Sequence, residues 1–461
     1  MSISRSTSSQ QHRVQRFAAT TDANRFFSRF NAPDLLETLE KLTPNYRERI
    51  YTPGETLSMF MTQALKADRS CQGIVNDAAV IRWRQGMEPC STNTGGYCSA
   101  RQRLPIEMVS GLLEATGQVI SKTVPQRGLW NGHRVRVVDG TTVTLPDTAA
   151  NQAGYPQMTN QKPGLGFPIC RIVVAICLSS GAIMNAAIGK YQGKKTGETA
   201  LFRSMLDTFD KGDVILADAL YATYFMLLEL QSRGMEALFE QHGARKRSTD
   251  FLKGEKLGCK DHLITLPKPK VRPDWMTEDA YASAPATLTV RELSVGGKVL
   301  VTTLFCPRAA PKAALKALYK RRWNVELDIR NIKTTLGMET LTCQTPEMAK
   351  KEVFVYLLAY NVIRLMMNES ALLADVVSRS LSFKHTLQLW LAWSAIPGQS
   401  EKTEIDKDIL RLVAEQTVGN RAGRIEPRAI KRRPKPYPLL MQARTAARKQ
   451  VEKFGHPKKI R

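Results

Sequence analysis

The segment from Tyr319 to Lys333 would carry a lone carboxylate among cations on one helical face, which marks it as a place where chemistry could occur. On a helix, residues three or four positions apart share a face. One face of this segment would then carry a tyrosine, two arginines, one glutamate and a lysine: Tyr319, Arg322, Glu326, Arg330 and Lys333. A carboxylate binds hard metal cations, and guanidinium and ammonium groups bind phosphate oxygens. The pattern therefore indicates a site for metal ions and phosphates, although i,i+4 ion pairs on a surface helix would use the same residues.

Two aspartates upstream lie in segments that are typical of strands. Asp139 belongs to the alternating segment 134–145, in line with valines and a threonine at 135, 137, 141 and 143. Asp218 ends the apolar run 213–218, which resembles a central strand. A carboxylate in such a place needs a partner or a metal, because burying an uncompensated charge is costly. Either aspartate could instead cap a turn or a helix, which is a common use of Asp.

The elements that must position these acids follow from the periodicity. The glutamate segment has an apolar stripe beside its charged face, formed by Leu318, Val325, Ile329, Ile332 and Leu336. Around the aspartates, a hairpin is expected at 169–188, a helix at 197–209, a strand at 213–218, a helix at 221–232 and a strand at 235–241. This order of elements resembles a ribonuclease-H-like α/β core, in which acids on the first and fourth strands approach each other.

The spacing Tyr-x2-Arg-x3-Glu-x6-Lys is met in full by Tyr319, Arg322, Glu326 and Lys333. It resembles the signature of the insertion-sequence-four family of DDE transposases. Asp218 followed by a tyrosine at 221 is similar to the family's second motif, although the arginine often found between them is absent here.

This resemblance implies a DNA transposase that binds the ends of a mobile element, cleaves them and transfers the 3′ ends into target DNA. It implies that Asp139, Asp218 and Glu326 are the catalytic residues and that they hold two Mg2+ ions, for which Mn2+ can substitute. The implied partner is double-stranded DNA, bound by a homodimer in a synaptic complex. Tyr319, Arg322, Arg330 and Lys333 would contact that DNA.

About seventy residues, 242–311, separate the expected core strands from the glutamate segment. Strands are expected at 263–266, 286–295 and 298–305, the last two joined as a hairpin across two glycines. Members of the family carry a β-rich insertion at this point. Trp275, the only tryptophan of the insertion, is a candidate for stacking on an unpaired base, and burial in the insertion's own core is the alternative.

The first 126 residues are expected to form a helical DNA-binding domain that begins with a disordered basic arm. A capping box at Thr52 opens one helix, and further helices are expected at 73–84 and 99–121. Arg101 and Arg103 are candidates for DNA contacts, with a helical bundle carrying solvated arginines as the alternative. The other expected units are the first part of the core (127–241), its second part (312–375) and a helical segment with a basic C-terminal tail (376–461).

Composition supports a nucleic-acid partner. The 461 residues include 67 Lys and Arg against 42 Asp and Glu, a net charge of +25. An apolar run as long as a membrane-spanning helix is absent from the sequence, so no membrane partner is expected. Eight cysteines without CxxC spacing indicate reduced thiols and no zinc site. The cysteines indicate a cytoplasmic protein, and the family resemblance implies a bacterial one associated with the nucleoid.

Two other functions remain open from the sequence. A ribonuclease-H-like nuclease or resolvase would cut DNA without joining strands. A decayed transposase acting as a DNA-binding regulator would keep the charge and need none of the carboxylates.

Overall fold

The computed structural model describes residues 38, 41–46, 49–84, 86–87, 90–394, 403–418 and 440–455. A mixed sheet of nine strands runs through the middle of the molecule, in the order β3-β2-β1-β4-β5-β9-β8-β7-β6. The core strands are β1 (Val135–Thr144), β2 (Ile169–Cys177), β3 (Ile183–Lys190), β4 (Val214–Ala217) and β5 (Glu236–Glu240). β2 is antiparallel to β1 and β3, whereas β4 is parallel to β1 and to β5.

Apolar residues alternate between the two faces of the core strands and give each face its own hydrophobic core. Val137 packs into the core on the side of the long helices, and the adjacent Val138 packs into the core on the other side. The long helices are α7 (Ile106–Lys122) and α15 (Pro346–Leu373), and the opposite face is covered by α9 (Glu198–Arg203) and α10 (Tyr224–Ser232). A short helix α8 (Ala149–Gly154) and two 3-10 turns, η2 (Gln126–Gly128) and η3 (Leu206–Thr208), complete the connections.

α15 and α7 hold the sheet directly. Asn361 of α15 is fully buried; its side chain accepts from the backbone N–H of Ile183 and donates to the carbonyls of Ile183 and Leu113. On α7, a Cβ added to Gly117 would lie 2.2 Å from the Ile183 carbonyl oxygen, so only glycine allows this helix to pack so close to β3. Both long helices are therefore anchored on β3, the strand at one edge of the sheet.

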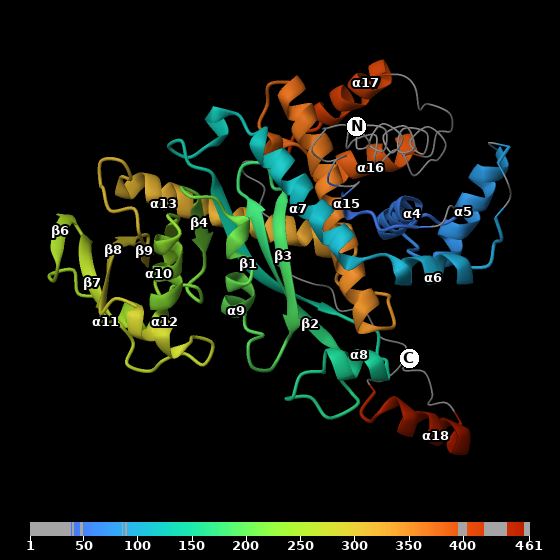
Figure 1. Cartoon of the computed structure of the whole chain (residues 1–461), viewed down its shortest axis with the longest axis horizontal. Coiled ribbons are helices and arrows are strands. Elements are labelled where there is room, and N and C mark those ends of the chain that lie inside the picture. The colour runs from blue at the N-terminus through green and yellow to red at the C-terminus, as the bar shows by residue number, and fades with distance from the viewer. Residues whose placement is uncertain are drawn as a thin grey trace, which may run out of the picture.

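The insertion extends the same sheet instead of forming a separate one. Its strands are β6 (Glu255–Gly258), β7 (Asp261–Pro267), β8 (Thr287–Val295) and β9 (Lys298–Thr302), with helices α11 (Gly243–Ser248) and α12 (Glu278–Ser283) beside them. β9 pairs antiparallel with β5, and this pairing joins the insertion to the core. Figure 1 shows these strands at one end of the molecule and the N-terminal helices at the other.

The N-terminal helices are α4 (Pro53–Leu65), α5 (Cys71–Arg84) and α6 (Gly95–Arg103). The side chain of Thr52 accepts a hydrogen bond from the backbone N–H of Glu55 at the start of α4, as the capping box predicted. The single helix expected at 99–121 is wrong: the chain breaks between α6 and α7. Pro105 has no N–H and favours an extended residue before it, and Leu104 has ψ 121°.

The glutamate segment is helical but irregular. It consists of α13 (Lys312–Lys320), a 3-10 turn η4 (Arg321–Trp323), α14 (Asn324–Arg330) and a π-helical turn η5 (Asn331–Thr335). Of its expected apolar stripe, Leu318, Val325, Ile332 and Leu336 are buried and Ile329 is half-buried. The buried stripe was therefore predicted well. The single regular helix that was expected is instead interrupted by a 3-10 turn and ends in a π-helical turn.

Three further helices follow α15 and the 3-10 turn η6 (Ser378–Ser380). They are α16 (Phe383–Ser394), α17 (Thr403–Ala414) and α18 (Arg444–Phe454). α18 lies in the basic C-terminal tail, whose residues 440–455 are described; the basic start of the chain lies outside the described residues. None of the helices in the described residues is long and apolar enough to cross a membrane.

Candidate active site

Asp139 and Asp218 occupy matching positions on neighbouring strands. β1 and β4 are parallel, and Val137 lies opposite Leu216. Asp139 follows Val137 by two residues, and Asp218 follows Leu216 by two residues. The two strands run side by side in the same direction, so this register brings Asp139, within β1, next to Asp218, which directly follows β4. The charge of Asp218 acts on Asp139 and raises its pKa.

Glu326 approaches the aspartates from α14, which packs against β1. Arg322 lies between the two acids: its Nη1 is 3.5 Å from Asp139 Oδ2, and its Nη2 is 3.8 Å from Glu326 Oε1. The side chains of Arg322 and Asp139 are 14% and 17% exposed, whereas that of Glu326 is 41% exposed. One guanidinium therefore joins the strand-borne acid to the helix-borne acid.

The Asp139 carboxylate is in a place that disfavours its charge. Burial, together with the negative charges of Asp218 and Glu198, raises the pKa of Asp139 to about 6. Arg322 and a hydrogen bond from the backbone N–H of Gly140 to Oδ1, 2.9 Å long, act in the opposite direction and offset only part of the rise. The buried carboxylate thus lacks enough stabilising groups of its own to offset the cost of burying its charge.

Tyr319 borders the site with a buried hydroxyl. The residue is 8% exposed, and within the described part of the chain its hydroxyl has no hydrogen-bond partner of sound geometry. Burial raises the pKa of Tyr319 to about 12, while the nearby Arg322 opposes that rise. A buried hydroxyl costs free energy unless it is hydrogen-bonded, so this one is suited to an external acceptor such as a phosphate oxygen.

A fourth acid, Glu198 at the start of α9, was missed from the sequence. Its carboxylate accepts a hydrogen bond from the Tyr221 hydroxyl (3.3 Å) and lies 3.6 Å from Nε of Arg171. It packs so closely on the backbone of β1 that a Cβ on Gly140 would meet it at 2.3 Å. Glu198 opens a short helix in an ordinary way, so no spacing in the sequence distinguishes it from a helix-starting acid.

The remaining predicted DNA contacts are dispersed. Arg330 is exposed and Lys333 is half-buried, both on the glutamate segment. Arg103 is exposed at the end of α6. Arg101 is only 8% exposed, because its guanidinium lies over the rings of Phe60 and Tyr97 at 4.7 and 5.0 Å. In this arrangement Arg101 is packed inside the helical bundle, so it is not solvated as the alternative had it, and its contact with DNA stays a prediction.

Trp275 lies outside the acidic site. Its ring is edge-on to Phe225, with 6.2 Å between centroids, and the Arg203 guanidinium lies 3.3 Å from its centroid. Packing against α10 fits the alternative of a core tryptophan, and the contact with Arg203 uses a ring face that a stacked base would need. The exposed tryptophan nearest to the acids in sequence is Trp323, directly after Arg322 and 60% exposed.

The chain can now be compared with known proteins. The sequence model of the transposase DDE domain matches residues 130–362, slightly more than half of the chain. Over 350 residues the chain is 29% identical to the transposase InsG for insertion sequence element IS4 of Escherichia coli (strain K12), a similarity that covers 74% of this chain and 76% of that protein. It is also 29% identical over 136 residues to the putative transposase InsZ of the same organism, covering 29% of this chain and 44% of that protein.

The matched family segment contains both strand-borne aspartates and the complete Tyr-Arg-Glu-Lys signature. The three acids therefore all lie within the family's own domain. The chain belongs to the DDE transposases of the insertion-sequence-four family, and it is a DNA transposase, as its signature predicted.

Proposed function

We propose that Asp139, Asp218 and Glu326 are the catalytic carboxylates of this transposase and that its core is of the ribonuclease-H type. The observation that carries the proposal is the strand register, which puts Asp139 and Asp218 at matching positions on adjacent parallel strands. The strand order β3-β2-β1-β4-β5, with β2 antiparallel to its neighbours, supports the fold type.

The donor chemistry of the site fits Mg2+ or Mn2+. Its candidate ligands are carboxylates, which hard divalent cations prefer. Burial, with a smaller effect of the neighbouring acids, raises the pKa of Asp139, and a divalent cation beside this carboxylate would favour its charged form. As the side chains stand, no three His, Cys, Asp or Glu residues in the described ranges are grouped to hold a metal. Arg322 lies between Asp139 and Glu326 instead, so metal binding requires this guanidinium to turn away.

We propose that a DNA phosphate draws Arg322 out of that position. Arg322 would then bind a phosphate oxygen together with the Tyr319 hydroxyl and Lys333, leaving the carboxylates to hold the metal ions. When bound, two divalent ions supply Lewis-acid stabilisation of the attacking and leaving oxygens in phosphodiester cleavage. The protein's own part is to orient the phosphate and to keep the three carboxylates fixed around it. Two element ends require two such sites, so we expect two copies of the chain in the synaptic complex.

Isosteric variants test the catalytic assignment. Asp139→Asn, Asp218→Asn and Glu326→Gln should each abolish Mg2+-dependent nicking while binding to an end-containing duplex and the circular dichroism spectrum stay normal. Combining two of them should cost little more than one, because residues that act as a unit fail together. Asp274→Asn, an exposed aspartate in the insertion, is the matched control and should cut normally. A single-site variant that still cuts at near-normal rate would remove that residue from the assignment.

A further inference from the structure

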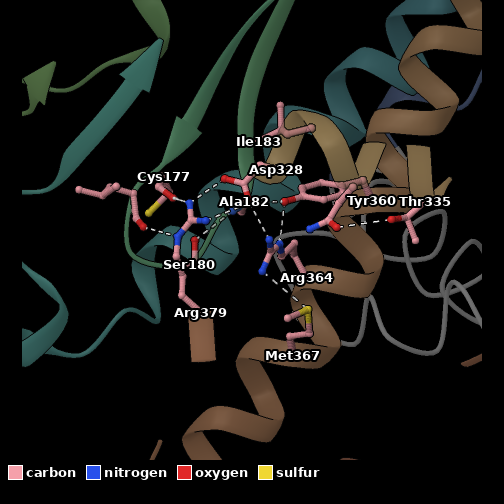
Figure 2. A network of polar contacts seen from close by, with 12 residues as sticks. Cys177, Ser180, Ala182, Ile183, Asp328, Thr335, Tyr360, Arg364, Met367 and Arg379 are labelled. Carbon is pink, nitrogen blue, oxygen red and sulfur yellow. Dashed lines mark hydrogen bonds and ion pairs between the residues drawn. The ribbon is translucent and has the colours of Figure 1, made fainter. Parts of the chain in front are cut away.

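One guanidinium connects the helix that carries Glu326 to the sheet that carries Asp139. Arg379, in the 3-10 turn η6, donates from Nη1 and Nη2 to the two carboxylate oxygens of Asp328, at 2.9 and 2.8 Å. The same group donates from Nε to the carbonyl of Leu178 (2.5 Å) and from Nη2 to the carbonyl of Cys177 (3.3 Å). Figure 2 shows Arg379 between Asp328 and the backbone at the end of β2.

Asp328 is the anchor on the helix side. It lies two residues after Glu326 on α14, and residues two apart on a helix point in different directions. Asp328 is fully buried, whereas Glu326 is partly exposed. Its Oδ1 also accepts from Nη2 of Arg364 (2.6 Å) and from the Tyr360 hydroxyl (3.0 Å), both on α15. The buried face of α14 is therefore held by charged hydrogen bonds, which are directional and shorter than neutral ones.

β2 is the anchor on the sheet side. It pairs with β1 along its whole length, with Cys177 opposite Arg136 and Val174 opposite Asp139. A contact that fixes the end of β2 therefore fixes the strand that carries Asp139. Arg379 spans the space between β2 and α14, so its four hydrogen bonds set the position of one half of the acidic site relative to the other.

The α14 segment needs such an anchor. It has only seven residues and lies between a 3-10 turn and a π-helical turn, so a long regular helix does not fix its direction. A small rotation of α14 would move the Glu326 carboxylate away from the aspartates. Arg364 and Arg379 both lie beyond residue 362, where the match to the transposase DDE domain ends.

We propose that Arg379 is a positioning residue for the metal site: through Asp328 and the end of β2 it holds α14 against β1, so that the Glu326 side chain can join Asp139 and Asp218 around metal ions once Arg322 has turned away. This inference rests on the proposed role of the three carboxylates. It assigns to the segment after α15 a part in catalysis, although no atom of Arg379 belongs to the acidic site.

A merely structural arginine is the alternative, and the chain supplies a close match for it. Arg291, in the insertion, donates from Nε and Nη2 to the buried Asp261 and from Nη1 to the carbonyls of Leu304 and Ala310. Like Arg379, it bridges one aspartate and two backbone carbonyls. None of these groups belongs to α14, which carries Glu326, or to β2. Its loss reports what breaking such a bridge does to folding alone.

The test measures Mn2+ affinity directly, by electron paramagnetic resonance of free Mn2+ during titration of the full chain. The variants are Arg379→Gln, Arg379→Lys, Arg291→Gln and Glu326→Gln. Lysine keeps the charge beside Asp328 but lacks the planar fork that reaches four acceptors, so Arg379→Lys remains informative if Arg379→Gln does not fold. Hydrogen exchange of residues 324–335 gives a second readout of how firmly α14 is held.

We expect Mn2+ to bind at least tenfold more weakly to the Arg379→Gln and Arg379→Lys variants, as is typical when the support of a metal ligand is removed. Amide exchange in 324–335 should accelerate in both. Arg291→Gln should bind Mn2+ as the parent does, even if it melts at a lower temperature. Parent-like Mn2+ affinity in both Arg379 variants, with weakened binding in Glu326→Gln, would overturn the positioning role and leave the proposed function intact. Equal Mn2+ binding by the parent and Glu326→Gln would instead overturn the metal role of Glu326, and this inference with it.

Discussion

Replacing Asp139 with asparagine should make the metal-free protein more stable while it destroys activity. The pKa of Asp139 rises from 3.8 to about 6 on folding, chiefly because the carboxyl is buried. The folded chain therefore binds this proton more tightly than the unfolded chain does, and stability falls as pH rises through the window between these two values. A shift of about 2 units at ~1.4 kcal/mol per unit amounts to about 3 kcal/mol once the group is fully ionised.

An uncharged asparagine of the same shape escapes this cost. Asp139→Asn should raise the free energy of unfolding in EDTA by about 3 kcal/mol at pH 8 and by less than ~1 kcal/mol at pH 4, where the folded-state carboxyl is still protonated and the unfolded-state carboxyl is only about half ionised. Urea unfolding at the two pH values measures the difference, and Asp274→Asn serves as the exposed control. Mg2+ should stabilise the parent and leave the variant unchanged. A gain in stability that is equal at pH 4 and pH 8, or a loss at pH 8, would refute the argument from burial.

Three further predictions concern single contacts. Arg322→Ala should weaken binding to a cleaved end and lower the slope of log K against log salt by about one, because one phosphate contact is lost; an unchanged slope in filter binding would count against that contact. Arg101→Ala should lower the melting temperature without altering the salt slope, because the guanidinium packs on Phe60 and Tyr97, whereas Arg103→Ala should do the reverse; a salt slope that drops for Arg101→Ala would show that it reaches DNA after all. Gly117→Ala should destabilise the fold by about 1–3 kcal/mol in urea unfolding, because its Cβ would lie 2.2 Å from the backbone carbonyl oxygen of Ile183, while Gly197→Ala, with open space around it, should cost far less; equal costs would contradict the close packing.

The family and most core elements could be predicted because they depend on local patterns. Alternation of apolar residues fixes β1, and a short apolar run fixes β4, since each strand must face a hydrophobic core. The Tyr-x2-Arg-x3-Glu-x6-Lys spacing lies within fifteen residues, so it survives any error about distant contacts. The local irregularities were less predictable. The break at Pro105 was missed although proline marks it, and the 3-10 and π turns around α14 have no sequence signal as strong as proline.

Whether each charged residue is buried, and which groups it contacts, depends on the tertiary structure. The sequence shows that Arg101, Arg103, Arg322 and Arg379 are cations, but it does not show which of them are buried. Arg101 is enclosed by aromatic rings, Arg322 lies between two acids, and Arg379 bridges a helix and a strand far from it in the chain.

The net charge thus predicted that this protein binds a polyanion, and the Tyr-Arg-Glu-Lys signature predicted the class of reaction. Tertiary structure decided that Asp139 and Asp218 share a register, that Glu198 lies beside them and that Asp328 holds the glutamate helix. The physical reason is that burial and pairing depend on side chains brought together from distant parts of the sequence, whereas periodicity and spacing depend only on neighbours.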